Sequence, residues 1–316
     1  MNLKRYKLLA GDASFRKFYR SKKNSIIVYS KENKKLNLAV YDAVNNCFNK
    51  NGVNAPKLKR ENYKKNYIEI EDLGNISISR LLQNKRKKNR IYFKVIKILK
   101  SIQKIQNKNL INFKKKKYKI PQYTKFKLLK ESELFLDWYL PRVIKKKQVK
   151  KAKKEIKVNL NNLYKKLKLK KKVIVHRDFH VSNMMYYKKK IYIIDSQDVV
   201  YGNIAYDLAS LIDDVRFKTS KELKESIFKI FIKLNSFIDK DKFKNDFEIL
   251  SVLRNFKIIG IFTRLAVRDK KRKYLKMIPY AWKMIEQRMS NNLLFKDLEI
   301  NLNKYFSKKV RLKKWK

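Results

Sequence analysis

His176-Arg177-Asp178-Phe179-His180-Val181-Ser182-Asn183 is a polar loop between two short apolar segments. The first segment, Val173–Val175, directly precedes the loop, and the second, Ile191–Ile194, ends just before Asp195. Short runs rich in β-branched residues predict strands. Almost all of the chain after Ser79 otherwise has the spacing of amphipathic helices. A strand pair alone among helices indicates a functional loop.

The residue types in this loop match the requirements of phosphoryl transfer. The spacing is that of the H-R-D-x-x-x-x-N catalytic loop, with a second acidic residue twelve positions after the Asn. Asp178, at a strand end, is placed to act as the base that orients an attacking hydroxyl. Asn183 and Asp195 supply oxygen ligands of the kind that Mg²⁺ takes. We expect two neighbouring strands to bring these groups together for an ATP-dependent, Mg²⁺-dependent reaction.

His176 and His180 are the only histidines in the chain, and both lie in this loop. A zinc site of the H-x-x-x-H type needs both side chains on one helical face, whereas His176 follows a predicted strand. We therefore expect His176 to support the loop by packing and hydrogen bonding. Asp198, four residues after Ile194, and Asp207, at the start of a predicted helix, are further candidates for structural support.

The first third of the chain reads as short strands with one helix, in the order β-β-β-α-β. These elements are expected at residues 6–9, 15–20, 25–30, 36–49 and 67–70. The pattern predicts an α+β, protein-kinase-like bilobal fold. A small antiparallel-sheet N-lobe would cover residues 1–74, and a large, mainly helical C-lobe would cover residues 75–316.

The nucleotide is expected to bind without a glycine-rich motif, because the five glycines are isolated and match neither G-x-x-x-x-G-K-[ST] nor G-x-G-x-x-G. Gly11, Ser14 and Arg16 lie in the turn between the first two predicted strands, where a kinase-like lobe covers the phosphates. A simple hairpin turn is the alternative interpretation. Glu71 and Leu73 follow the last strand of this lobe, where the backbone can meet the adenine edge.

One feature of active kinases is missing from the predicted strand over residues 25–30, which has no internal lysine. Kinases commonly use such a lysine to hold the α- and β-phosphates. Lys31 and Arg16 are the candidates to replace it. A catalytically inactive kinase fold therefore stays open as an alternative, although the base and both metal ligands are present.

The composition is strongly basic, with 83 Lys+Arg against 27 Asp+Glu and a formal net charge of +56. Such a charge can indicate a nucleic-acid partner. The excess is mostly lysine and is spread over the whole chain, which favours a compositional bias, so we expect no specific nucleic-acid partner. Cys47 is the single cysteine, and no signal peptide or membrane-spanning run is recognisable. The sequence thus predicts a cytoplasmic monomer with no membrane partner.

Several segments together resemble the aminoglycoside phosphotransferase and choline kinase superfamily, and more narrowly the bacterial N-acetylmuramate/N-acetylglucosamine anomeric kinases. The similar segments are residues 10–20, 70–74, 134–139, 176–183, 194–198, 206–211 and 257–274. They extend over nearly the whole chain. Ser196 is a departure, since the family usually has Phe there.

The resemblance implies an enzyme that uses ATP to phosphorylate the anomeric hydroxyl of an amino sugar for cell-wall recycling. It carries over Asp178 as base, Asn183 and Asp195 as Mg²⁺ ligands, and Ser14 as a phosphate-loop residue. The candidates for contact with the sugar or phosphate are Arg177, His180, Arg264 and Arg268.

Three other functions match the sequence less well. An aminoglycoside or choline kinase binds a cationic substrate, whereas Arg264, Arg268 and several lysines lie in the segments expected to face the substrate. A protein kinase would need a longer segment than the twelve residues from Asp195 to Asp207. An inactive kinase fold that binds nucleic acid would show steeply salt-dependent binding.

Overall fold

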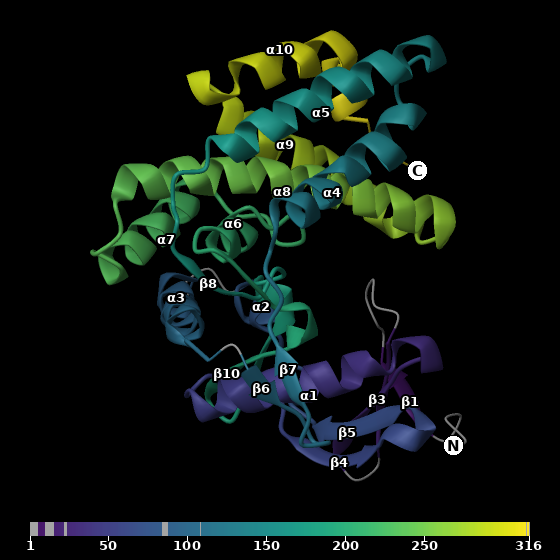
Figure 1. Cartoon of the computed structure of the whole chain (residues 1–316), viewed down its shortest axis with the longest axis vertical. Helices are drawn as coiled ribbons and strands as arrows, with labels where there is room; N and C mark the ends of the chain where they lie inside the picture. Colours follow the sequence, from purple (N-terminus) through teal and green to yellow (C-terminus); the bar gives the residue numbers. More distant parts are fainter. Residues whose placement is uncertain are drawn as a thin grey trace. The chain divides into compact units, whose positions relative to one another are not determined.

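The computed structural model describes residues 6–9, 16–21, 24–83, 88–107, 109–313 and 315. The chain divides into two compact units (Figure 1). The first unit consists of Met1–Gln122, Lys172–Tyr201 and Glu225–Leu234. The second unit consists of Tyr123–Lys171, Gly202–Lys224 and Asn235–Lys316.

A five-stranded antiparallel sheet is the largest β element of the first unit, with the spatial order β1-β2-β3-β5-β4. Its strands are β1 (Lys7–Leu9), β2 (Lys17–Arg20), β3 (Ser25–Tyr29), β4 (Leu58–Asn62) and β5 (Tyr67–Glu71). The sequence pattern predicted all of these except β4. That strand reads Leu-Lys-Arg-Glu-Asn and lies at the sheet edge, so it has no apolar alternation to reveal it.

Helix α1 (Leu36–Lys50) covers one face of this sheet (Figure 1). Alternate residues of β3 point to opposite faces, so Ile26 and Val28 pack against Leu38 and Tyr41 of α1. The intervening Ile27 belongs to a separate cluster and is also fully buried. Burial on both faces explains why β3 is almost continuously apolar.

The predicted pairing around the catalytic loop is wrong, because two separate two-stranded sheets form there. Strand β8 (Lys172–Val175) pairs with β11 (Val200–Asn203), whereas β10 (Lys190–Ile193) pairs with β9 (Met184–Tyr187). A two-residue turn with positive φ at Lys188 and Lys189 connects β9 to β10, which is the tight hairpin geometry. Another short hairpin, β6 (Asn109–Ile111) with β7 (Lys117–Lys119), also lies outside the elements expected from the sequence.

The remaining elements are helices. The first unit contains α2 (Ile78–Leu81) and α3 (Lys88–Lys104), and α7 (Lys221–Leu234) has residues in both units. The second unit contains α4 (Lys125–Leu134), α5 (Val149–Lys165), α6 (Tyr206–Ile212), α8 (Lys240–Arg268), α9 (Ile278–Met289), α10 (Lys296–Tyr305) and α11 (Lys308–Arg311).

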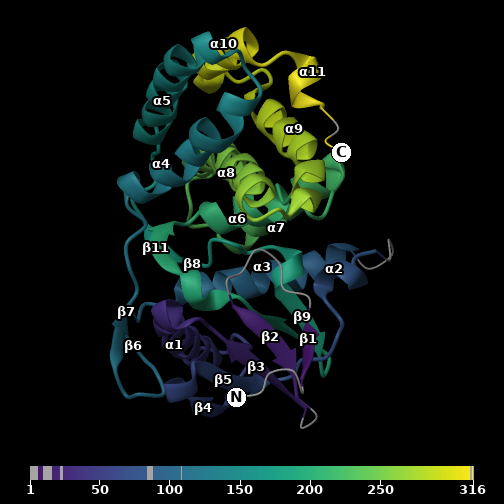
Figure 2. The ribbon, with the colours of Figure 1, turned by 90° about the vertical axis from the view of Figure 1, so that its right-hand side faces the viewer.

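Helix α8 is the central element of the second unit and packs against α4, α6 and α9 (Figure 2). The Asp239 side chain caps it by accepting hydrogen bonds from the backbone N–H groups of Asp241 and Lys242. Residues 249–260 are all buried, as expected of a helix surrounded by other helices. No helix among the described residues has the length and apolarity needed to cross a bilayer.

Gly260 allows α8 to approach the end of α4 closely. A Cβ at this position would lie 2.3 Å from the carbonyl carbon of Leu134 and 2.5 Å from the backbone nitrogen of Phe135. At that point α4 ends and a π-helical turn, Phe135–Tyr139, takes over. The α-helix is therefore interrupted before Pro141, because the π turn takes about one residue more than an α-helical turn.

Candidate active site

The catalytic loop leaves β8 at Val175 and is anchored by His176. The imidazole is buried, and its Nε2 lies 3.2 Å from the carbonyl oxygen of Ile194. The ring also meets Phe179 edge-on, with centroids 6.2 Å apart. Arg177 follows in the left-handed region, with φ of 74°. His176 thereby connects the end of β8 to the residue just before Asp195.

Hydrogen bonds around the carbonyl oxygen of Asp178 hold the centre of the loop. This oxygen accepts a bond from the backbone N–H of His180 at 3.1 Å and from Nδ2 of Asn183 at 3.0 Å. The backbone N–H of Asn183 donates to the carbonyl of His180 at 2.9 Å. The loop therefore closes into a compact turn, with the Asp178 side chain partly exposed at its start.

Asn183 and Asp195 are brought close together by the backbone. The N–H of Ile194 donates to the carbonyl of Asn183 at 3.1 Å, which extends the β9–β10 pairing by one step. Since Nδ2 of Asn183 is bonded to Asp178, the amide oxygen is left without a donor among the described residues. That oxygen and the half-exposed carboxylate of Asp195 are hard donors, so the pair fits Mg²⁺.

Asp195 has a left-handed backbone, with φ of 67°, and two donors reach its Oδ1. Arg16 forms an ion pair with it, and Gln197 Nε2 donates to it at 3.3 Å. The side chain of Arg16 is 1% exposed, whereas that of Asp195 is 36% exposed. The guanidinium thus approaches from inside the unit and leaves the carboxylate partly open.

Helix α1 supports the segment that follows Asp195. Ser196 Oγ donates to Oδ1 of Asn45 at 2.6 Å, and both residues are buried. Burial raises the pKa of the Tyr41 hydroxyl, and the Tyr41 ring centroid lies 5.3 Å from the guanidinium of Arg16. Ser196 stands where the similar family usually has Phe, and it makes a polar contact with Asn45 of α1 instead of an apolar one. Sequence reasoning missed Tyr41 and Asn45, because a polar residue in an amphipathic helix gives no signal of its partner.

Gln197 and Asp198 connect the segment around Asp195 to the loop over residues 176–183. Gln197 Nε2 donates to Oδ2 of Asp198 at 2.7 Å. Arg177 Nη1 donates to the carbonyl oxygen of Asp198 at 3.3 Å and lies 3.9 Å from its carboxylate. Arg177, expected to contact substrate, thus contacts Asp198. Gln197 was missed, although its position between two aspartates could have indicated a bridging donor.

The predicted nucleotide-binding residues lie in different parts of the first unit. Gly11 and Ser14 are outside the described residues. Glu71 ends β5, and Leu73 is buried just before Gly74, which has φ of +74°. Arg20 fixes this segment, since it pairs with Asp72 and donates to the carbonyl of Gly74 at 3.0 Å.

The remaining predicted residues belong to the second unit, except for His180, which is buried in the catalytic loop. Asp207 is the second residue of α6 and is fully buried. Arg264 and Arg268 lie one turn apart near the end of α8. Desolvation and the charge of Arg268 lower the pKa of Arg264, whose Nε has no partner among the described residues. Arg268 binds Asp269 through two bonds of 2.7 and 2.9 Å.

With this geometry in place, comparison with known proteins identifies the family. The model of the phosphotransferase enzyme family matches residues 5–232. The chain belongs to this family. It is a phosphotransferase, and the expected α+β, protein-kinase-like fold class is confirmed.

Among the relatives of the phosphotransferase is an N-acetylmuramate/N-acetylglucosamine kinase of Neisseria meningitidis serogroup B. It is 28% identical over 282 residues, which are 85% of this chain and 81% of the relative. A choline/ethanolamine kinase family protein from Mesorhizobium loti has a similar structure, with a TM-score of 0.61, 11% identity, and coverage of 94% of this chain and 92% of that one. An ADP-bound aminoglycoside phosphotransferase has a TM-score of 0.58, 12% identity, and coverage of 88% and 93%.

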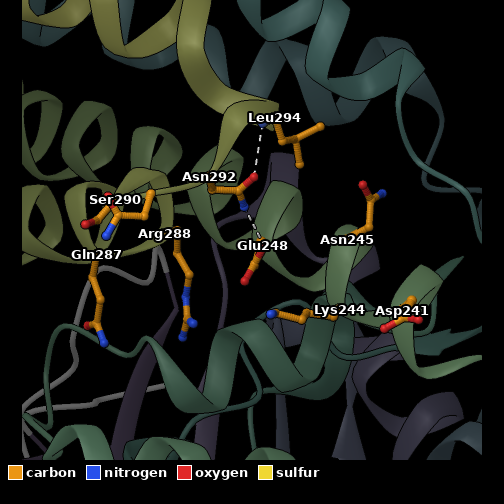
Figure 3. A pocket seen from close by; sticks show the side chains of 10 residues that line it. Asp241, Lys244, Asn245, Glu248, Gln287, Arg288, Ser290, Asn292 and Leu294 are labelled. Carbon is orange, nitrogen blue, oxygen red and sulfur yellow. Dashed lines mark hydrogen bonds between the residues drawn. The ribbon is translucent and has the colours of Figure 1, made fainter.

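A pocket of about 390 Å³ lies in the second unit of the phosphotransferase (Figure 3). Its lining comes from the start of α8 and the end of α9, and it holds none of the predicted site residues. Some of its polar groups already have partners: Asn292 donates to Glu248 at 2.7 Å, and Arg288 donates to Oδ2 of the buried Asp213 at 2.9 Å. The catalytic loop is therefore the better candidate for the chemistry.

Proposed function

We propose that the protein transfers a phosphoryl group from Mg-ATP to the anomeric hydroxyl of an amino sugar, either N-acetylmuramate or N-acetylglucosamine. The observation that carries this proposal is the compact loop in which Asn183 connects Asp178 to the Asp195 segment. The curated relative at 28% identity bears a name for the same activity. The adenine nucleotide is supported by the fold of the ADP-bound neighbour.

In this proposal, Asp178 accepts the proton of the sugar hydroxyl, and its carboxylate orients that oxygen toward the phosphate. Asn183 and Asp195 would hold Mg²⁺, which neutralises charge on the transferring phosphate. Three residues act indirectly, by positioning the loop with Asp178 and Asn183 and the segment with Asp195. Asp198 accepts hydrogen bonds from both Arg177 and Gln197, which fixes these two segments to each other. His176 connects the end of β8 to the end of β10 through the contact of its Nε2 with the carbonyl oxygen of Ile194.

The acceptor is assigned from charge and from the relatives. Arg264 places a half-buried cation near the end of α8, which suits the carboxylate of N-acetylmuramate or a neutral sugar better than a polycationic aminoglycoside, whereas Arg268 is paired with Asp269. Desolvation of Arg264 strengthens its interaction with an anion. We place the reaction in the cytoplasm, in the recycling of cell-wall precursors, with residues 1–74 and 75–316 acting as N-lobe and C-lobe of one kinase-like domain.

The test uses purified protein with Mg-ATP and a panel of acceptors: N-acetylmuramate, N-acetylglucosamine, kanamycin and choline. We expect ADP release only with the amino sugars, and a phosphorus NMR signal of an acid-labile sugar 1-phosphate. Phosphorylation of kanamycin or choline alone would overturn the acceptor assignment. ADP release with none of the acceptors would overturn the proposed function.

A further inference from the structure

Arg16 is a buried arginine beside a candidate metal ligand. Its side chain is 1% exposed, and its guanidinium lies 5.3 Å from the ring centroids of both Phe18 and Tyr41. Its charge is matched by Asp195. Burial of a charge is costly even when it is paired. The arrangement therefore keeps a cation at the metal-binding carboxylate at a cost in stability, which is typical of a functional site.

Strand β3, which is described in full, has no lysine that could take the place of Arg16 at the phosphates. In the described part of the chain up to Gln122, Arg16 is the only buried lysine or arginine. Strand β3 reads Ser-Ile-Ile-Val-Tyr, and Lys31 just after it is exposed. The one acidic residue of α1, Asp42, accepts bonds from the backbone N–H of Phe113 and from Asn46. Helix α1 thus has no carboxylate left to steady a strand lysine.

We infer that Arg16 is the cation that binds the α- and β-phosphates of the nucleotide, and that Asp195 holds it until the metal–nucleotide complex enters. The inference rests on the proposed function, because it requires an adenine nucleotide in this site. A guanidinium matches phosphate oxygens with two parallel hydrogen bonds. Arg16 is also the last residue of the segment 11–16, which the sequence predicts as the phosphate loop.

The exchange of partners follows from charge. Asp195 is occupied by Arg16 through the same carboxylate that is the candidate metal ligand. A divalent cation at this carboxylate repels the adjacent guanidinium, so Asp195 does not hold both. Phosphate oxygens that arrive with the metal give Arg16 a new anionic partner. Asp195 and Arg16 therefore each exchange one ionic contact for another, and neither is left buried without a counter-charge.

The experiment measures ADP binding to the full-length protein by calorimetry, with EDTA and with Mg²⁺, and without sugar. In EDTA, Asp195→Asn should tighten ADP binding several-fold, because Arg16 is released to the phosphates. With Mg²⁺, Arg16→Gln should weaken ADP binding about 10- to 100-fold, as expected for loss of charge-assisted hydrogen bonds. Lys17→Gln removes an exposed positive charge one residue away and should change affinity less than threefold.

The double variant Arg16→Gln/Asp195→Asn decides between release of Arg16 and simple removal of a repulsive carboxylate. If Arg16 is released, the gain from Asp195→Asn disappears in the Arg16→Gln background. A gain that persists there, or no gain in the single variant, would overturn the exchange. Wild-type affinity in Arg16→Gln would overturn the phosphate-binding role. Arg16→Lys keeps the positive charge but loses the paired hydrogen bonds of the guanidinium. It replaces Arg16→Gln in the binding measurement if the melting temperature shows that Arg16→Gln does not fold.

Two further outcomes separate this inference from the proposed function. Tight ADP binding without phosphorylation of any amino sugar would overturn the acceptor assignment and leave the role of Arg16 standing. A wild-type protein that binds no adenine nucleotide would overturn both.

Discussion

Asn183 donates its side-chain amide to the backbone carbonyl of Asp178 at 3.0 Å, so the candidate metal ligand and the candidate base share one hydrogen bond. The bond uses the amide nitrogen and leaves the amide oxygen for the metal. A change at either residue therefore affects both the position of the base and the geometry of the metal site.

Asp178→Asn should reduce turnover by about 10²- to 10⁴-fold, because the amide cannot accept the proton of the sugar hydroxyl. Nucleotide affinity should stay within threefold of wild type, since the backbone carbonyl that bonds Asn183 remains. Steady-state kinetics with the preferred amino sugar and calorimetry with ADP measure the two quantities. Asp137→Asn, at an exposed ion pair with Lys153, is the matched control. Near-normal turnover in Asp178→Asn would exclude it as the base.

Replacement of Asn183 should separate its two roles. Asn183→Ala removes both the metal oxygen and the bond to Asp178, so the Mg²⁺ concentration for half-maximal rate should rise about 10- to 100-fold. Asn183→Asp keeps an oxygen ligand but loses the donor, and should retain more Mg²⁺ affinity than the alanine variant. The measurement is the rate as a function of Mg²⁺ concentration. Equal Mg²⁺ dependence in wild type and Asn183→Ala would contradict metal binding by Asn183.

Ser196→Ala should destabilise the first unit by about 1–3 kcal/mol, because the buried Oδ1 of Asn45 loses its donor. Urea denaturation followed by circular dichroism measures the loss. Ser101→Ala, which removes an exposed hydroxyl that bonds only the carbonyl of Lys97, should change stability by less than about 0.5 kcal/mol. Equal effects of the two substitutions would show that the contact between Ser196 and α1 is not stabilising.

Stability should depend on pH through Asp42, whose pKa is raised by burial from 3.8 to about 6. A carboxyl with a raised pKa binds its proton more tightly in the folded state. Its stabilisation is therefore complete below about pH 4 and is lost as the pH rises through about 6. Asp42→Asn stays neutral and keeps an acceptor for the N–H of Phe113.

At pH 4 the free energy of unfolding of Asp42→Asn should equal that of wild type. At pH 8 it should be higher than that of wild type by up to about 3 kcal/mol. Denaturation curves for both proteins across this range give the difference, which cancels the titration of all other groups. A constant difference between pH 4 and pH 8 would show that Asp42 does not titrate with a raised pKa.

Gly260→Ala should destabilise the second unit, although alanine usually favours a helix over glycine by about 1 kcal/mol. The new methyl would meet backbone atoms of Leu134 and Phe135, which cannot move without disturbing α4. We expect a net loss of about 1–3 kcal/mol or more. Thermal melting against Val267→Ala, at a partly exposed site of the same helix, tests the sign. A higher melting temperature for Gly260→Ala would contradict the close approach.

Sequence patterns predicted the elements that bury many apolar residues. Strand β3 and helix α1 are of this kind. Strand β4 was missed because edge strands can be polar throughout. The pairing of β8 with β11 was also missed, because strand pairing depends on contacts distant in sequence.

The chemical residues of the candidate site follow from the loop motif, but their partners do not. A charged residue next to a surface turn is expected to be exposed, so no pattern indicates that Arg16 is buried against Asp195. Gln197 and Asn45 are likewise defined only by what they contact after folding. The sequence thus indicates which groups can react, whereas the tertiary structure determines how each group is held.

The π turn Phe135–Tyr139 has a consequence for the length of the chain. Each residue removed from a helix rotates everything after it by about 100° relative to what precedes it. A π turn takes about one residue more than an α-helical turn, so deletion of one residue here would restore a regular α-helix and leave Tyr139 near Trp282, whose Nε1 donates to the tyrosine hydroxyl at 3.1 Å. This segment should therefore tolerate the loss of one residue, whereas a deletion within α4 would turn Tyr139 away from Trp282.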